Sequence, residues 1–311
     1  MGNRRTIRRF RKERRITKLI SFILIFGGLL FGAGPYQILL FPHDARSLSL
    51  QNSVSAFDNP LLQNNPAALS KRSKGNTYSY FYLPANIHFT GLQNVNHSSS
   101  GVRAYKISFM SYGAIIDGKT EDKSYAFDIL LESGFKKEYK NITSIGISGG
   151  YLFSSIAGYQ SQIIFSNFGI RSRLLRKRLG VGLSLENIGF LLKSYTDFKE
   201  PIPALFRMAL YYKPRYIPLI INGDMVTYLG DGDSFYFSGA IELKPNDSFT
   251  LRLGSSSHRS GYLTDDFSSD VIAGFSGGAG FCFTNMTLDV GFMNLGSYGF
   301  VVGFSLLKKL D

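Results

Sequence analysis

From residue 75 onward, the sequence alternates between apolar residues and small or polar residues with a period of two. In the segment Leu179 to Gly189, LGVGLSLENIG, the side chains of Val181, Leu183 and Leu185 fall on one face, and small or charged residues fall on the other. Successive side chains of a β-strand point to opposite faces. The period therefore predicts strands whose two faces meet different surroundings.

Segments of this kind recur along the chain, and turn signals such as Asp117-Gly118 and Pro245-Asn246-Asp247 separate them. No amphipathic helix pattern interrupts them, and no low-complexity linker divides the chain. We therefore predict one all-β domain of about thirteen or fourteen strands. The predicted strands lie near residues 77–92 (one or two strands), 102–112, 123–133, 142–154, 159–171, 179–189, 205–213, 216–228, 234–244, 248–257, 271–284, 286–294 and 299–307.

Two architectures accommodate so many strands in one domain: a soluble sandwich-type domain and a membrane-spanning barrel. Strands of about ten residues fit a tilted bilayer crossing, and a face of Gly, Ser and Thr suits a polar lumen better than a packed core. Aromatic residues near strand ends are typical of the belts that barrels place at membrane interfaces. The predicted belt residues are Tyr78, Tyr80, Tyr112, Tyr151, Tyr228, Tyr262 and Tyr298.

A closed barrel also pairs every backbone N–H and C=O group in a lipid environment and leaves no open sheet edge. It needs no disulfide, and the single cysteine of this chain, Cys282, allows no intramolecular disulfide. We therefore predict a transmembrane antiparallel β-barrel. Because single-chain barrels favour an even number of strands, about 14 strands are expected.

The formal net charge of +13 is concentrated at the N-terminus. The first 18 residues hold nine basic side chains and one acidic one, and the apolar segment Leu19 to Gly34 follows. This order predicts a secretory signal peptide at residues 1–34, cleaved near residues 32–35, and explains the charge without nucleic acid as a partner. The alternative is an uncleaved N-terminal anchor, although the apolar run is shorter than the roughly 20 residues of a transmembrane helix.

A segment of different composition, residues 35–76, precedes the predicted barrel body at residues 77–308. It contains FDNPLLQNNPAALS, with two Asn-Pro pairs. Asn65 can cap a short helix whose first residue is Pro66, because asparagine accepts hydrogen bonds from the first free N–H groups and proline suits the first helical position. The segment is either a capped turn leading into the first strand or a plug inside the lumen. The plug hypothesis buries three leucines in the lumen: Leu61, Leu62 and Leu69.

The stretch from Tyr36 to Ser70 resembles the N-terminal signature of the PorV/PorQ family. Members open with an aromatic residue, a proline and an Ala-Arg pair, followed by an acidic or Asn-rich turn and an Asn-Pro-Ala motif. The matching positions are Tyr36, Pro42, Ala45, Arg46, Asp58, Asn65, Pro66 and Ala67. The spacing from Tyr36 to Pro42 is closer to PorQ than to PorV. The Asn-Pro-Ala element is also similar to that of FadL-like channels, whose N-terminus plugs a fourteen-stranded barrel.

The resemblance implies a non-enzymatic barrel in the outer membrane of a Gram-negative-type bacterium, with outer-membrane lipid around it. PorV/PorQ proteins are components of type IX secretion that dock cargo or partner proteins, so other secretion-system proteins or exported cargo are the implied partners. A FadL-like channel for hydrophobic small molecules is the alternative. A docking barrel needs structured loops, whereas a channel needs an apolar pocket and an open path. The longest predicted loops are residues 93–101, 193–204 and 257–270.

No catalytic or metal-binding arrangement stands out. The stretch Gly146 to Gly150 matches G-x-S-x-G, but it lies inside an alternating strand, whereas a nucleophile elbow needs a strand-turn-helix. Gly230 to Asp233 and the acidic residues between 265 and 270 lack EF-hand spacing, and the four histidines lack metal-ligand spacing. We therefore expect no enzymatic activity, no cofactor and no metal site.

Overall fold

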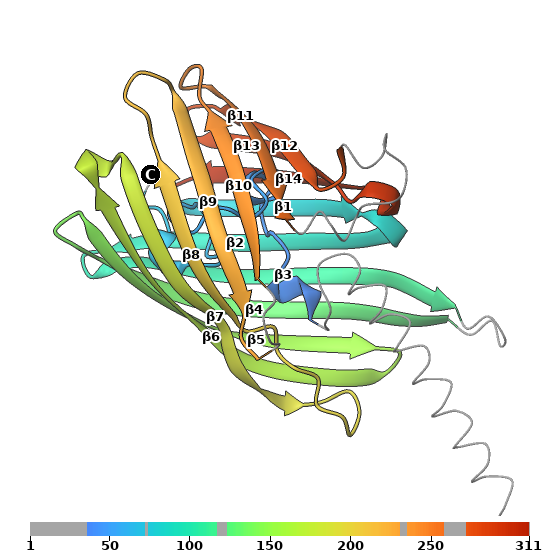
Figure 1. Ribbon diagram of the computed structural model, residues 1–311. Coiled ribbons are helices and arrows are strands. Elements are labelled where there is room, and N and C mark those ends of the chain that lie inside the picture. Colours follow the sequence, from blue (N-terminus) through green and yellow to red (C-terminus); the bar gives the residue numbers. More distant parts are fainter. Residues whose placement is uncertain (1–35, 72–73, 117–122, 231–234, 258–271, 311) are drawn as a thin grey trace, which may run out of the picture.

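The chain forms a closed antiparallel barrel of 14 strands in which each strand pairs with its sequence neighbours and β1 pairs with β14 (Figure 1). The structure, a computed structural model, describes residues 36–71, 74–116, 123–230, 235–257 and 272–310. The predicted all-β fold and strand number are confirmed, whereas the signal peptide lies outside the described residues. Among the helices of the described part of the chain, none is long and apolar enough to cross a membrane.

The barrel runs from Gly75 to Lys309, close to the predicted body at residues 77–308. Its strands are β1 (Gly75–Leu83), β2 (Ile87–Ser98), β3 (Gly101–Ile116), β4 (Lys123–Tyr139), β5 (Thr143–Ile156), β6 (Tyr159–Leu174), β7 (Leu179–Lys193), β8 (Leu205–Tyr212), β9 (Leu219–Tyr228), β10 (Phe235–Leu243), β11 (Phe249–Ser256), β12 (Phe275–Cys282), β13 (Met286–Asn294) and β14 (Phe300–Lys309). Short 3-10 turns separate several of them: η3 (Pro84–Asn86), η4 (Leu175–Lys177) and η6 (Gly296–Tyr298).

The two ends of the barrel differ in the length of their connections. The turns from β2 to β3, β4 to β5 and β12 to β13 are short, and the first and last strands begin and end at this same end. The opposite end carries the long connections from β7 to β8 and from β11 to β12. We call these the short-turn end and the long-loop end. The predicted loop at residues 93–101 is wrong, because residues 93–98 continue β2.

Side chains alternate between the lumen and the outer face as the sequence predicts. On β11, Leu251 and Leu253 are exposed on the outer face, and Arg252 between them is buried in the lumen. Phe235 and Phe237 of β10 are likewise exposed outward. The aromatic belt is only partly as predicted: Tyr78 and Tyr80 face outward, as expected of belt residues.

Tyr112 is a correction to the predicted belt. Its hydroxyl donates to Asp128 at 2.7 Å, so it points into the barrel and forms part of its interior. Tyr151 faces outward from the middle of β5, away from either strand end, whereas Tyr262 lies outside the described residues.

The interior is mostly apolar toward the long-loop end, although the buried Asp128 lies there and accepts hydrogen bonds from Tyr112 and Ser154. Leu83 at the end of β1 and Ile87 at the start of β2 lie there, together with Ile156 and Ile163 near the β5–β6 turn. The largest side chains of this apolar cluster are Tyr36, Phe41, Phe81, Phe89, Phe165 and Tyr195. Toward the short-turn end the lumen instead holds charged side chains, which are described below.

Arginine placed on the outer face should destabilise the barrel far more than arginine placed in the lumen. Leu253 is 64% exposed at the middle of β11, so Leu253→Arg puts a charge among lipid chains at a cost of about 2–4 kcal/mol. Thr250→Arg, on the opposite face near the short-turn end, is expected to cost about 1 kcal/mol or less. Urea unfolding of the barrel in lipid vesicles measures both. Equal costs would contradict a membrane-facing outer surface.

Candidate functional site

The N-terminal segment, residues 36–70, lies inside the barrel (Figure 1). It contains η1 (Gln37–Leu39), α2 (Ala45–Ser49) and η2 (Pro66–Ala68). α2 packs against β11 to β14, whereas η2 packs against β4 to β7, so the segment spans the lumen from wall to wall. Leu61, Leu62 and Leu69 are buried, as the plug hypothesis expects.

Asn65 caps η2 as the sequence predicts. Its side-chain oxygen accepts a hydrogen bond from the N–H of Ala67 at 2.9 Å, and Pro66 occupies the first helical position. The amide nitrogen of Asn65 donates to the carbonyl oxygens of Ile170 at 3.2 Å and Leu183 at 3.3 Å. One side chain therefore both starts the turn and ties it to β6 and β7.

Glycines in the wall allow η2 to lie close to the backbone of β5 and β6. Gly146 of β5 and Gly169 of β6 are directly paired in the sheet. A Cβ atom at Gly146 would overlap backbone atoms of Pro66 and Ala67, and one at Gly169 would overlap the side chain of Asn65. The Asn-Pro-Ala element thus fits a notch that only glycine can form.

The Ala-Arg pair is held by the opposite wall. The N–H of Ala45 donates to Ser305 of β14 at 2.9 Å. The guanidinium of Arg46 donates to Glu242 of β10 at 2.9 Å. Glu242 also accepts from Arg252 at 2.8 Å, and this arginine pairs in turn with the carboxylate of Asp289. Arg46 therefore joins a buried chain of alternating charges that crosses β10, β11 and β13.

Asp58 and Pro42 complete the predicted motif. The carboxylate of Asp58 pairs with Arg171 of β6 at 2.7 Å. Burial acts to raise the pKa of Asp58, but the charges of Arg171 and Lys136 outweigh it, so this pKa lies below its usual value. Pro42 is buried just before Asp44, which caps α2 by accepting from the N–H of Ser47 at 2.8 Å.

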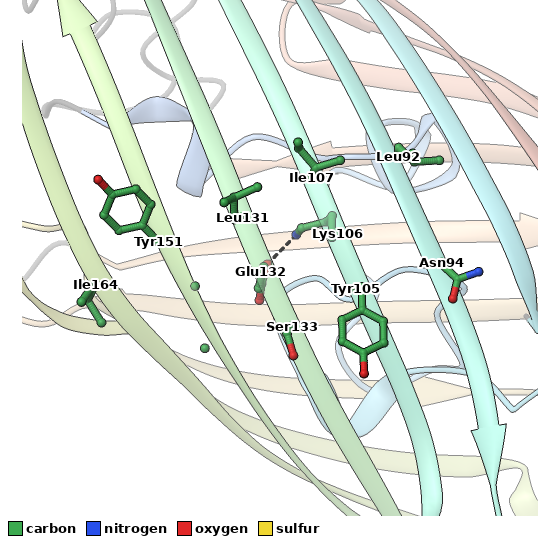
Figure 2. Close-up of a pocket in the computed structure, with 12 residues that line it drawn as sticks. Leu92, Asn94, Tyr105, Lys106, Ile107, Leu131, Glu132, Ser133, Tyr151 and Ile164 are labelled. Atoms are coloured by element: carbon green, nitrogen blue, oxygen red, sulfur yellow. Dashed lines mark ion pairs between the residues drawn. The ribbon is translucent and has the colours of Figure 1, made fainter.

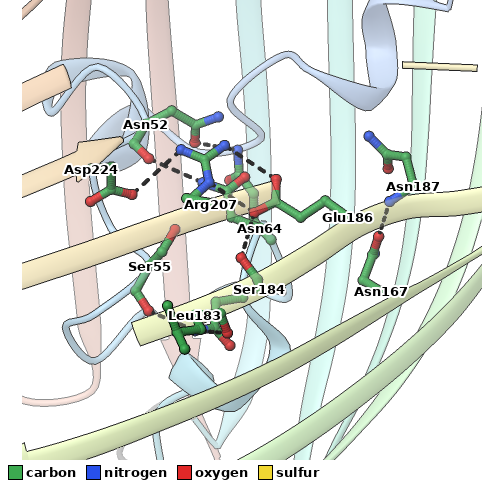
Figure 3. A network of polar contacts seen from close by, with 12 residues as sticks. Asn52, Ser55, Asn64, Asn167, Leu183, Ser184, Glu186, Asn187, Arg207 and Asp224 are labelled. Atoms are coloured by element: carbon green, nitrogen blue, oxygen red, sulfur yellow. Dashed lines mark hydrogen bonds and ion pairs between the residues drawn. The ribbon is translucent and has the colours of Figure 1, made fainter. Parts of the chain in front are cut away.

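A second charged network joins the wall to the middle of the segment (Figure 3). Arg207 of β8 donates to Glu186 of β7 at 2.8 Å and approaches Asp224 of β9 at 3.4 Å. Ser184 donates to Glu186 at 2.7 Å, and Ser53 of the N-terminal segment donates to Asp224 at 2.9 Å. All these groups are buried, so the ionised side chains satisfy one another instead of contacting bulk water.

The wall is interrupted between β7 and β8. Their pairing ends at Glu186 and Leu205, although β7 continues to Lys193 with only β6 as its partner. A register shift in the β6–β7 pairing lies at this point, where the N–H of Asn187 donates to the side chain of Asn167 at 2.6 Å (Figure 3). We call the stretch of β7 at residues 188–193 the wall break.

The wall break borders the apolar cluster. On its inner side, Leu191 and Ile202 of the following loop pack against that cluster. On its outer side, Phe190 is 61% exposed. Tyr195, in the same loop, stacks on Tyr36 with ring centroids 5.9 Å apart and so covers the cluster from the long-loop end.

A groove of about 720 Å³ lies on the outer wall instead of in the lumen (Figure 2). Its floor consists of Ser133, Gly149 and Gly150, and its sides are outward-facing apolar residues: Leu92, Tyr105, Ile107, Leu131, Tyr151 and Ile164. Behind the wall, Lys106 and Glu132 form an ion pair of 2.6 Å. The groove therefore faces lipid chains if the barrel lies in a membrane.

The G-x-S-x-G stretch is part of β5, as predicted. Ser148 is buried in the lumen and donates to Glu132 at 2.8 Å, with no histidine beside it in any described contact. Within the described residues, no group of three or more His, Cys, Asp or Glu side chains could hold a metal ion. Asp231, Asp233 and the acidic residues between 265 and 270 lie outside the described residues.

Removing the Asn65 cap should loosen the N-terminal segment without unfolding the barrel. Asn65→Ala loses the bond to Ala67, worth about 1 kcal/mol, and the two bonds to wall carbonyls. We expect faster protease cleavage within residues 36–70 and an unchanged heat-modifiable barrel on gels. Asn64→Ala is the matched control, because Asn64 donates to Asn52 within the segment and makes no hydrogen bond to the wall among the described residues. Equal cleavage of both variants would contradict this role of Asn65.

No protein-family model matches the sequence, and a search of curated proteins finds no match. The fold is similar to solved structures of hydrocarbon channels. The Pseudomonas putida toluene transporter TodX matches with a TM-score of 0.53 and 12% identity over 91% of this chain and 97% of that one. The CymD monoaromatic hydrocarbon channel matches with a TM-score of 0.56 and 12% identity over 86% and 97%. The similarity supports the barrel fold alone, and the PorV/PorQ resemblance gains no support from it.

Proposed function

We propose that this protein lies in an outer membrane after signal-peptide export and passes small hydrophobic molecules across it. The observation that carries the proposal is the apolar cluster at the long-loop end, which meets the wall break directly. The hydrocarbon channels of similar fold are consistent with it. The earlier alternative, a FadL-like channel, is therefore preferred to a docking barrel.

The geometry favours a path through the side wall of the barrel over a path along the barrel axis. Toward the short-turn end, the N-terminal segment and two buried charged networks fill the lumen, and a hydrophobic molecule gains nothing by displacing ionised groups. At the wall break, by contrast, an apolar interior is separated from the outside by the edge of one strand. A molecule that enters among the long loops would leave there, into the hydrocarbon of the membrane.

The side chain of Leu191 offers a test, because it is the inward-facing leucine of the wall break. Leu191→Asn places an amide on the proposed apolar path, where an unpaired polar group costs about 1–3 kcal/mol. Uptake of a radiolabelled monoaromatic hydrocarbon by expressing cells should fall about fivefold or more. Leu306→Asn, at a half-buried leucine of β14, is the control and should leave uptake unchanged.

Both variants are first compared for their amount in the outer-membrane fraction, so that uptake is normalised to inserted barrel. Uptake by the native protein no greater than in cells without it would overturn the proposal. So would recovery of the protein in the inner membrane with Met1 retained.

A docking role of the PorV/PorQ type, as a component of type IX secretion, is the second candidate. The observation that favours it is the filled lumen, since a protein that only holds a partner needs no path. Its partners would be secretion-system proteins or exported cargo, bound through the long-loop end. Absence of hydrocarbon uptake together with recovery of such a partner from solubilised outer membrane would favour this candidate over the channel.

A further inference from the structure

Three neighbouring turns at the short-turn end carry a concentration of basic side chains. They connect β4 to β5, β6 to β7 and β8 to β9, which are consecutive strands of the barrel. We call them the basic sector: residues 137–142, 174–178 and 213–217. Its basic residues, all exposed or half-buried, are Lys137, Lys140, Arg176, Lys177, Arg178, Lys213 and Arg215. The single acidic residue in these ranges, Glu138, is already paired with Lys71 and Arg173.

Apolar side chains project from the same turns. Tyr216 is 86% exposed, Leu175 is 67% exposed and Ile142 is 50% exposed. The guanidinium of Arg215 lies over the ring of Tyr216 at 5.4 Å. Exposed tyrosine and aliphatic residues interleaved with basic ones are typical of polypeptide at a membrane interface, where the apolar part enters the acyl boundary and the charge meets the headgroups.

The shape of the sector is fixed by hydrogen bonds between the turns and the adjoining strands. The N–H of Lys213 donates to the carbonyl of Arg178 at 2.7 Å, and the hydroxyl of Tyr211 donates to the carbonyl of Lys177 at 3.1 Å. The residues Leu175, Arg176 and Lys177 all adopt positive φ angles, between 46° and 67°. Such a run is uncommon for residues with a Cβ atom, and its two basic residues, Arg176 and Lys177, are exposed.

We propose that the basic sector binds the phosphate headgroups of anionic phospholipids in the leaflet at the short-turn end. Clusters of four to eight Lys and Arg residues beside a membrane-spanning element attract anionic lipid, with about a fivefold gain in affinity per residue close to the surface. The apolar tips favour a lipid surface over an acidic protein, because they need a hydrocarbon boundary. The inference rests on the proposed membrane location of the barrel and not on what passes through it.

Lipid selectivity of the full chain in phosphatidylcholine vesicles tests the proposal. Electron spin resonance of spin-labelled phosphatidylglycerol and spin-labelled phosphatidylcholine gives the relative association constant of the two lipids at the barrel surface. The test variant carries K140Q, R176Q and R215Q, and the matched control carries K123Q, K193Q and K199Q at the long-loop end. Both lose three positive charges at exposed positions.

The native protein should favour phosphatidylglycerol, and the test variant should lose about threefold or more of that selectivity. The control should keep it, and 0.5 M salt should weaken it in the native protein, since exposed charges are screened over about 3–10 Å at such ionic strengths. Equal selectivity in the two variants, or none in the native protein, overturns the proposal; an acidic protein would then be the partner to seek. The measurement uses no hydrocarbon substrate. Its result therefore does not depend on whether the protein transports hydrocarbons.

Discussion

Replacing Arg207 with methionine should destabilise the barrel by about 3–5 kcal/mol. Methionine fills much of the same space, so the loss comes from charge and not from a cavity. Glu186 and Asp224 would stay buried without the cation that lies 2.8 Å and 3.4 Å from their oxygens. A buried carboxylate that loses its partner costs far more than an intact pair contributes. Urea unfolding of the barrel in lipid vesicles measures the difference.

Lys244→Met is the control for this prediction. Lys244 is about half exposed and contacts Glu242 at 3.3 Å, while Glu242 keeps Arg46 and Arg252 as partners. Because Lys244 itself is half exposed and the buried Glu242 keeps two arginine partners, Lys244→Met should cost only about 0–1 kcal/mol. If Arg207→Met is equally mild, water must reach Glu186 and Asp224, and the lumen is more open than the structure implies. If only Arg207→Met lowers the free energy of unfolding, the result supports a lumen that is closed to water.

The strands and their faces could be predicted because alternation is local. A residue's face follows from its parity along the strand, so Leu251 and Arg252 are assigned to opposite sides without knowledge of any other strand. The end of β2 was missed for the same reason. Apart from Val95, residues 93–98 are polar and resemble a loop, yet Gln93 is buried and accepts from the N–H of Leu62 at 2.7 Å. One apolar residue, Val95, which packs with Leu62 and Leu69, is too little to make an alternating pattern.

The N-terminal segment could be predicted as a capped turn but not placed against particular wall residues. The Asn-Pro pair specifies the cap at Asn65 within three residues. The pair between Arg46 and Glu242 joins positions 196 residues apart and depends on the register of every strand between them. The only hint in the sequence was the occasional charge on the small-residue face of a strand, such as Glu186 or Glu242. The wall break could not be predicted from the sequence of β7 either. It arises because β8 begins at Leu205, opposite Glu186, and so leaves residues 188–193 of β7 without a partner on that side.

Gly146→Ala should displace the N-terminal segment from its contacts with the barrel wall. The new Cβ atom would overlap backbone atoms of Pro66 and Ala67, which cannot rotate away as a side chain could. Overpacking of this kind costs about 1–3 kcal/mol. Displacement of η2 from its notch relieves the overlap at the lowest cost in free energy. The strands themselves tolerate alanine, so the barrel should remain heat-modifiable. We therefore expect faster protease cleavage within residues 36–70 and channel openings in planar bilayers where the native protein stays closed.

Gly149→Ala is the matched control, since Gly149 lies on the same strand but faces outward, and a Cβ atom there would find its nearest neighbour at 3.7 Å. The control should match the native protein in cleavage and conductance. If Gly146→Ala opens the channel, the segment is the barrier that closes the lumen toward the short-turn end. If the variant exposes the segment without any conductance, the charged networks of the wall close the lumen by themselves. Unchanged cleavage in Gly146→Ala would mean that η2 does not occupy the glycine notch.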